Sequence, residues 1–196
     1  MVEPIFGDSI DRELDRVRDV VDYALDDLCE RDRHLLDPTV DINERSITHR
    51  LGMHLQRYFG DRWDVDCEYN RNLNSNNASE NVKRLPPDIP RQKVDWRDTN
   101  GITIYPDIIV HRRGVNTHNL LVVEVKKQNG QPSEWDLEKL RRLQATRADV
   151  ERIESQVDPY DMWYRYTLFI RFEQREGLPW PQKIWNDWQS NNWQNK

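Results

Sequence analysis

The chain has 196 residues and a formal net charge of −6, with 33% charged and 36% hydrophobic residues. This length is enough for one domain with a substantial core, and the negative charge argues against broad electrostatic capture of nucleic acid. No apolar run approaches the length of a membrane span, so we expect a cytoplasmic protein with no membrane contact. Its two cysteines, Cys29 and Cys67, form no zinc-binding pattern and are expected to be reduced thiols.

Residues 8–30 show a helical repeat of apolar side chains at steps of three and four, with charges of alternating sign between them. The pattern predicts an amphipathic helix within an N-terminal extension, residues 1–40. This helix packs either on the body of the domain or on a second copy of the chain. Its apolar positions are Ile10, Leu14, Val17, Val21, Leu25 and Leu28.

A second helix is predicted from Asn43, a favourable N-cap, to about Phe59, where Gly60 ends it. Glu44 lies in its first turn, three residues before Ile47, and so at the border of the buried side. One interpretation of Glu44 is a carboxylate stabilised by the helix dipole. The other is a carboxylate directed towards a functional site.

Residues 63–69 alternate between apolar and polar side chains and predict a half-buried strand. The segment 70–100 that follows is rich in Asn, Asp, Pro and Arg, which predicts a long loop. Two interpretations of this loop stay open: an arm that becomes ordered on a substrate, or a disordered surface segment.

Two apolar runs, 108–110 and 120–125, flank a polar turn and predict a hairpin whose second strand is buried on both faces. Asp107 stands at the head of the first strand, and Glu124 and Lys126 stand near the end of the second. Strand alternation puts Glu124 and Lys126 on one face, and the hairpin brings Asp107 beside them. Buried carboxylates are costly unless they are paired, hydrogen-bonded or bound to a metal, so these residues predict a site.

A third helix is predicted for residues 134–155, and its charged residues Lys139 and Arg142 are expected to face solvent. Residues 163–172 then predict a further strand beside the hairpin. The Trp-rich segment 176–196 contains Trp185 and Trp188, which share one face if the segment is helical. Because this segment has few cations, packing on the core or on a partner is favoured over stacking on single-stranded bases.

Pro106-Asp107, followed by Glu124-Val125-Lys126, resembles the PD-(D/E)xK motif of the restriction-endonuclease-like nuclease superfamily. The resemblance extends over residues 43–172. It implies a nuclease-like core at residues 41–175, with an α/β fold in which helices flank a mixed central sheet. The implied order of elements is helix, strand, hairpin, helix, strand.

The resemblance also implies a metal-dependent nuclease with DNA as its substrate. Asp107, Glu124 and the Val125 carbonyl would hold Mg²⁺ or Mn²⁺, for which oxygen atoms are the preferred ligands. Glu44 would complete a second ion site or bind a water molecule, and Lys126 would orient the attacking water or stabilise developing charge. Basic residues expected to contact nucleic acid are Arg112, Arg113, Lys127 and Lys139. Because a helix follows the lysine-bearing strand in this fold, the resemblance offers contact of Lys139 and Arg142 with a phosphodiester backbone as the alternative to solvent.

Two departures from parts of the superfamily narrow this expectation. After the lysine-bearing strand the Gln-x-x-x-Tyr spacing occurs at Gln156 to Tyr160, which is not a convincing match to the motif of the helicase-associated exonucleases and disfavours that branch. It also shows no separate sequence-reading domain, which disfavours a site-specific restriction enzyme. The alternative function is a noncatalytic nucleic-acid-binding or scaffold protein built on the same fold, and a homodimer or protein contact would use the N-terminal helix or the Trp-rich segment.

Overall fold

The computed structural model describes residues 10–69, 84–85, 102–103, 105–114, 118–127, 134–144, 163–187 and 194–195. Its helices are α1 (Ile10–Arg31), α2 (Glu44–Phe59) and α3 (Glu134–Leu143), with short 3-10 helices at Arg33–Leu36 and Gly60–Arg62. Its strands are β1 (Asp64–Cys67), β2 (Arg84–Leu85), β3 (Ile102–Thr103), β4 (Ile108–His111), β5 (Asn119–Lys126), β6 (Tyr166–Arg175), β7 (Leu178–Asp187) and β8 (Gln194–Asn195).

The described strands form one mixed sheet in the order β1-β4-β5-β6-β7-β8, and β2 pairs separately with β3. β4 and β5 are the predicted hairpin, with Ile108 opposite Val123. β5 and β6 run parallel, and Lys126 lies beside Arg171. The chain passes through α3 between these two strands. The fold is therefore α/β, as predicted, with a mixed sheet and three α-helices over the described residues.

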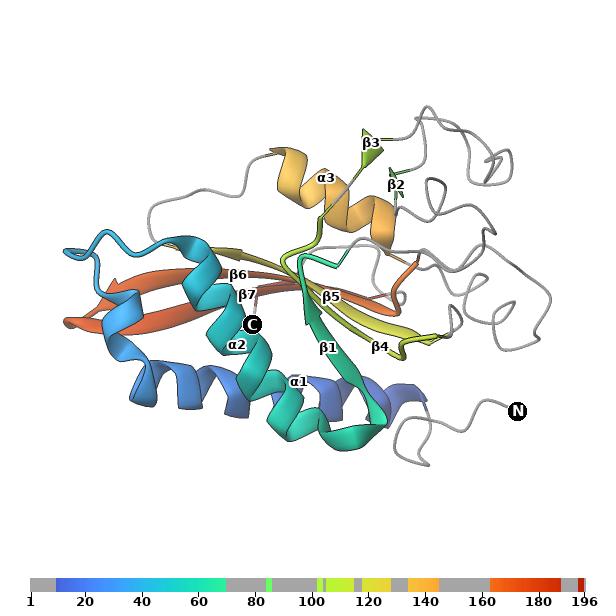
Figure 1. Ribbon diagram of the computed structural model, residues 1–196, viewed down its shortest axis with the longest axis horizontal. Coiled ribbons are helices and arrows are strands. Elements are labelled where there is room, and N and C mark those ends of the chain that lie inside the picture. The colour runs from blue at the N-terminus through green and yellow to red at the C-terminus, as the bar shows by residue number, and fades with distance from the viewer. Residues whose placement is uncertain are drawn as a thin grey trace.

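Helices cover both faces of the sheet. Figure 1 shows α1 and α2 on one face and α3 on the opposite face. The predicted apolar stripe of α1 enters a core that it shares with α2 and the sheet, so α1 packs on its own chain, the first of the two alternatives. Buried residues from α1 and α2 in this core are Val17, Val21, Leu25, Leu28, Ile47, Leu51 and Leu55.

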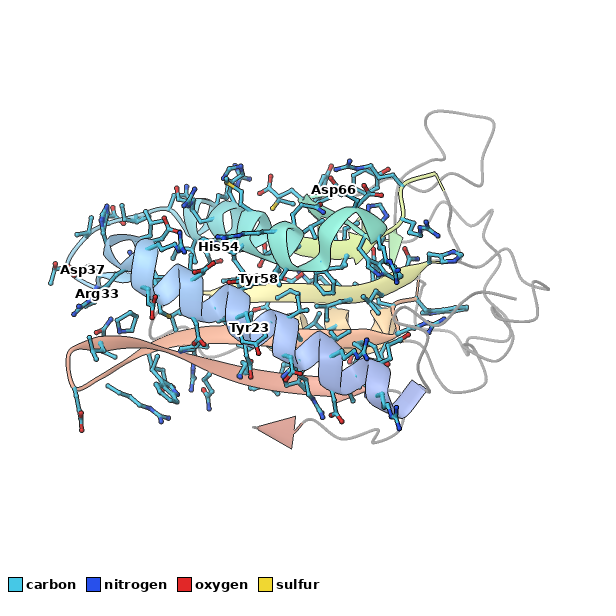
Figure 2. All side chains as sticks on the ribbon, turned by 90° about the horizontal axis from the view of Figure 1, so that it is seen from below. Tyr23, Arg33, Asp37, His54, Tyr58 and Asp66 are labelled. Carbon is cyan, nitrogen blue, oxygen red and sulfur yellow. The ribbon has the colours of Figure 1, made fainter. Side chains whose placement is uncertain are left out.

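Polar groups join α1 to α2 along one seam. The Nε2 atom of His54 lies 2.8 Å from Asp32 Oδ2, and the Tyr58 hydroxyl donates to Asp27 Oδ2 at 2.9 Å. The rings of Tyr23 and Tyr58 lie 5.7 Å apart between their centroids, and Figure 2 shows both, with His54, where the two helices face each other. The seam holds α2, and with it the first turn that contains Glu44, in a defined position against the sheet.

The ends of α2 form as the sequence predicts. The Asn43 side chain accepts a hydrogen bond from the Arg45 N–H at 3.0 Å, which satisfies one of the free donors of the first turn. Gly60 follows Phe59 with a φ of 66°, a backbone conformation that glycine adopts without steric cost. The N-cap therefore fixes where α2 begins, and with it the position of Glu44, the first residue of the helix.

The third helix is shorter than predicted. α3 ends at Leu143 instead of continuing to residue 155. Gln144 forms a parallel β-bridge with Tyr164, and the Tyr164 N–H donates to the Leu143 carbonyl at 2.8 Å. The Tyr164 N–H therefore satisfies the Leu143 carbonyl, which would accept a hydrogen bond from the next helical turn if the helix continued. Residues 145–162 lie outside the described residues. The predicted loop 70–100 also lies outside them, except for β2.

The Trp-rich segment forms a strand where a helix was considered. β7 pairs with β6 along its whole length, from Leu178 opposite Arg175 to Asp187 opposite Tyr166. Alternation along the strand buries Trp185, which is 2% exposed, and leaves Trp180 50% exposed. This part of the segment packs on the core of its own chain, whereas Trp188 and Trp193 lie outside the described residues.

We expect Trp185→Ala to lower the free energy of unfolding by about 3–5 kcal/mol, because loss of a buried indole leaves a cavity in the core. Urea denaturation followed by circular dichroism measures this change. Trp180→Ala is the matched control on the same strand and should cost no more than about 1 kcal/mol, since its ring is half exposed and contacts Arg175. Equal losses in the two variants would contradict the observed register of β7.

Candidate active site

The ends of four elements meet at one edge of the sheet. β5 ends at Lys126, and β4 begins at Ile108, directly after Asp107. Because β4 and β5 are antiparallel, the start of β4 lies beside the end of β5. α2 begins there with Glu44, and α3 brings Asp136 and Lys139 near Glu124 from the opposite face. The predicted residues Glu44, Asp107, Glu124 and Lys126 are thus brought together.

Asp107 is fixed by the strand beside it. Its Oδ2 atom accepts a hydrogen bond from the Val125 N–H at 2.8 Å, and its carbonyl accepts one from the Glu68 N–H at 3.2 Å. Burial raises the pKa of the Asp107 carboxyl, and the hydrogen bond from Val125 opposes this only in part. Asp107 is therefore an oriented carboxylate whose charge the protein does not fully stabilise. The role of the Val125 carbonyl as a ligand stays a prediction.

Glu124 is the most buried acid of the site. Its residue is 1% exposed, and its Oε2 atom lies 2.6 Å from the Lys139 Nζ. Its Oε1 atom has no hydrogen-bond partner within the part of the chain that the structure describes. Burial, together with the charge of Asp107, raises the pKa of Glu124 from its ordinary 4.5 to about 8, although the Lys139 ammonium acts in the opposite direction.

Glu44 reaches the site from the first turn of α2. Its Oε1 atom lies 3.2 Å from the Lys126 Nζ, and its Oε2 atom accepts the Lys127 N–H at 3.0 Å. Burial lowers the pKa of Lys126, but the charge and hydrogen bond of Glu44 outweigh it, so the net direction is upward. Of the two interpretations of Glu44, the structure thus favours a carboxylate directed towards the site. The Lys127 side chain donates to the Val40 carbonyl at 2.6 Å.

Lys139 does not lie on a solvated face, and its contact with nucleic acid stays a prediction. It is 9% exposed and paired with Glu124. Leu140, the next residue of α3, packs in the core with Val122 and Phe169, and this packing turns the Lys139 side of the helix towards the sheet. Its proximity to Glu124 could not be read from helical spacing alone.

Asp136 is a member of the site that the sequence analysis missed. It is 8% exposed, and its charge contributes to the raised pKa values of both Glu124 and Lys126. One signal was present: Asp136 precedes Lys139 by three residues, so the two side chains share one face of a helix. The helix that follows the lysine-bearing strand therefore supplies a carboxylate as well as an ammonium group.

This cluster of acids and lysines has a net negative charge that a divalent cation would neutralise. Four carboxylates (Glu44, Asp107, Glu124 and Asp136) stand against two ammonium groups (Lys126 and Lys139), an excess of two negative charges when all are ionised. Among the described residues, no group of three or more His, Cys, Asp or Glu side chains is placed to hold a metal ion by itself. Mg²⁺ is commonly bound by only one or two carboxylates, with waters and substrate phosphates as further ligands. The Glu124 Oε1 atom, which has no hydrogen-bond partner among the described residues, fits such an ion.

Two of the predicted nucleic-acid contacts lie away from this edge. Arg112 and Arg113 follow the far end of β4, roughly 15–20 Å from Asp107 at the usual rise of a strand. The Arg113 Nε donates to Asp66 Oδ2 at 2.8 Å, and its backbone N–H donates to Asp64 Oδ2 at 2.8 Å. The hairpin therefore separates these arginines from the site, and their contact with nucleic acid stays a prediction.

A hollow of about 540 Å³ lies between the end of α1 and the first half of α2. Three arginines line it, and each already forms an ion pair with a carboxylate of the chain. Because these charges are neutralised in place, the hollow has no excess of positive charge for an anionic ligand. The pairs are Arg31 with Asp27, Arg45 with Glu68 and Arg50 with Asp32.

Comparisons of this chain with family models, with curated proteins and with solved structures find no match. No helix within the described residues is long and apolar enough to cross a membrane. The function must therefore be inferred from the geometry of the site.

The raised pKa of Glu124 predicts a pH dependence of stability in metal-free buffer. The folded state holds the Glu124 proton up to about pH 8, whereas the unfolded chain releases it near pH 4.5. The contribution of Glu124 to stability is therefore present below pH 4.5 and is lost as the pH rises to 8, by up to roughly 1.4 kcal/mol per pH unit. Glu124→Gln, which cannot ionise, should remove this slope.

Urea unfolding of both proteins with EDTA from pH 5 to pH 8 measures the effect. The difference between the two curves reports the titration of Glu124 together with the groups coupled to it, Asp107 and Lys139 among them. Glu124→Gln should become progressively more stable than the unmodified chain as the pH rises. Parallel curves would mean that Glu124 is ionised throughout this range.

Proposed function

We propose that this chain is a metal-dependent nuclease with a restriction-endonuclease-like core, and that it hydrolyses phosphodiester bonds in DNA. The observation that supports this most is the convergence of Asp107, Glu124 and Lys126 with Glu44 at one edge of the sheet. The order α2, β1, β4, β5, α3, β6 is also the order of elements that the motif resemblance implies.

In this proposal, Asp107 and Glu124 hold Mg²⁺ or Mn²⁺, with the Val125 carbonyl and waters as further ligands. The bound ion supplies Lewis-acid polarisation of the phosphate and a lower pKa for the attacking water. The chain's contribution is to hold the two carboxylates together against their mutual repulsion. The Val125 N–H on Asp107 and the packing of β5 on both faces do this.

Lys126 supplies positive charge where negative charge develops on the phosphate. Its side chain is 28% exposed, so a substrate can approach it, and its hydrogen bond to Glu44 fixes its position. Both Glu44 oxygens accept hydrogen bonds from nitrogen donors, one from Lys126 and one from Lys127. Glu44 therefore acts as a positioning residue for Lys126 in this arrangement.

A noncatalytic scaffold on the same fold is the second candidate. The observation that favours it is that Lys126 and Lys139 are each already paired with a carboxylate of the chain. For either function we propose that the chain is cytoplasmic. There its two free thiols, Cys29 and Cys67, would stay reduced.

The experiment that tests the proposal is a titration of Mg²⁺ and Mn²⁺ with plasmid, linear and branched DNA, and with RNA, as substrates. Metal-dependent cleavage of DNA supports the nuclease, and preferential cleavage of RNA would correct the substrate class. Binding of nucleic acid without cleavage in either metal would favour the scaffold instead.

We expect Asp107→Ala and Glu124→Ala each to slow metal-dependent cleavage by roughly a hundredfold or more, because each removes a ligand of the ion. Asp107→Ala should not unfold the chain, since it removes a carboxylate with a raised pKa, whereas Glu124→Ala also leaves the buried Lys139 ammonium without its partner, so Glu124→Gln is measured beside it. Circular dichroism checks the fold, and single-turnover cleavage checks the rate. Asp22→Ala, which removes a half-exposed carboxylate on α1, is the control and should cleave normally. Normal cleavage by both site variants would disprove the assignment.

We expect Lys126→Ala to retain metal affinity, since a protonated lysine is not a ligand, and to slow the chemical step. The loss should be about ten- to a hundredfold or more, the scale of one preorganised electrostatic group. Lys126→Arg should restore little, because its planar guanidinium places charge differently. Calorimetry and single-turnover cleavage separate the two effects, with Lys183→Ala on β7 as the control. An unchanged rate in Lys126→Ala would exclude this role.

A further inference from the structure

Lys139 is the most buried ammonium group of the site. Its side chain is 11% exposed, and its Nζ lies 2.6 Å from Glu124 Oε2, whose own side chain is 2% exposed. An isolated ammonium group is costly to bury, so Lys139 depends on this carboxylate. Its position is set by the backbone of α3, because the neighbouring Leu140 is fully buried against the sheet.

The two lysines of the site contact different acids. The Lys126 Nζ lies 3.2 Å from Glu44 Oε1, an acid that the first turn of α2 supplies. Lys139 contacts Glu124 directly. Only one oxygen of Glu124 is engaged, and the other has no partner among the described residues.

We propose that Lys139 is a built-in counter-ion that competes with the divalent cation for Glu124 and thereby sets the metal affinity of the site. This inference rests on the proposed function. Two cations on one buried carboxylate repel each other strongly, because the surroundings screen charge poorly. A divalent ion at Glu124 therefore displaces the Lys139 ammonium or binds less tightly beside it.

Lys139 also has a role in the protein without metal. Asp107, Glu124 and Asp136 together place three carboxylates at a largely buried edge, where like charges destabilise the fold. When Glu124 is ionised and no metal ion is bound, the Lys139 ammonium offsets part of this repulsion. Removing it should therefore affect metal binding and metal-free stability in opposite directions.

The test compares three proteins by calorimetric titration with Mn²⁺ and Mg²⁺. Lys139→Met keeps the length and apolar stem of the side chain but removes its charge, and it should bind the ion about tenfold more tightly or better. Arg142→Met is the matched control on the same helix. Its guanidinium Nε lies 2.6 Å from Glu138 Oε1, so this variant removes a cation that is paired with a different acid, and its metal affinity should match that of the unmodified chain.

Two further variants keep the test decisive. Lys139→Gln can still hydrogen-bond to Glu124 without a charge, and it should bind metal as tightly as Lys139→Met even if the latter folds poorly. Lys139→Arg keeps the charge and should bind as weakly as the unmodified chain. In thermal unfolding, added Mn²⁺ should raise the melting temperature more for Lys139→Gln than for the unmodified chain.

The outcomes distinguish this inference from the proposed function. Equal metal binding by the unmodified chain and by folded Lys139→Gln would overturn the counter-ion role and leave the metal-dependent nuclease intact. Weaker binding in the variant would make Lys139 a support for the metal site instead of a competitor, and would also overturn the inference. No binding in any of the proteins would overturn both.

Discussion

The buried carboxylate of Glu124 is the constraint on which the rest of the site depends. It lies on β5, whose residues from Asn119 to Val125 are all buried. A charge in that environment is disfavoured, which is why its pKa is raised so far. The neighbours of Glu124 act on this charge in opposite directions: Asp107 and Asp136 raise its pKa further, and Lys139 lowers it. Lys139 neutralises one oxygen, and Asp107 is held beside it only with the help of a backbone N–H from Val125.

Rigid elements hold these groups together. The seam between α1 and α2 fixes the helix that begins with Glu44, and the packing of Leu140 fixes the helix that contains Lys139. β5 lies between them, paired with β4 on one side and β6 on the other. Sites built on packed helices and strands hold their groups in place more accurately than sites built on loops. The relative positions of the four acids are therefore a property of the core of the domain.

The features that depend on local periodicity could be predicted from the sequence. Alternation along the hairpin placed Glu124 and Lys126 on one face with Asp107 beside them, and the N-cap Asn43 placed Glu44 in the first turn of α2. Sequence reasoning could not find the partner of Lys139, because the rotation of α3 about its axis against the sheet depends on tertiary packing. The β7 strand was missed for a similar reason. Its pairing with β6 decides its conformation, whereas its Trp spacing fits a helical face equally well.

Stability alone gives no reason for this arrangement. Replacement of a buried ion pair by apolar residues of similar volume is often neutral or stabilising by about 1–4 kcal/mol. Valine and leucine already fill most of β5, so an apolar pair at positions 124 and 139 would extend the existing core. An unpartnered carboxylate oxygen adds a further cost, of roughly 1–3 kcal/mol. A site that binds a divalent cation requires both features: oxygen atoms held close together and one of them left open. The cost at Glu124 therefore supports a cation-binding role more than a purely structural one.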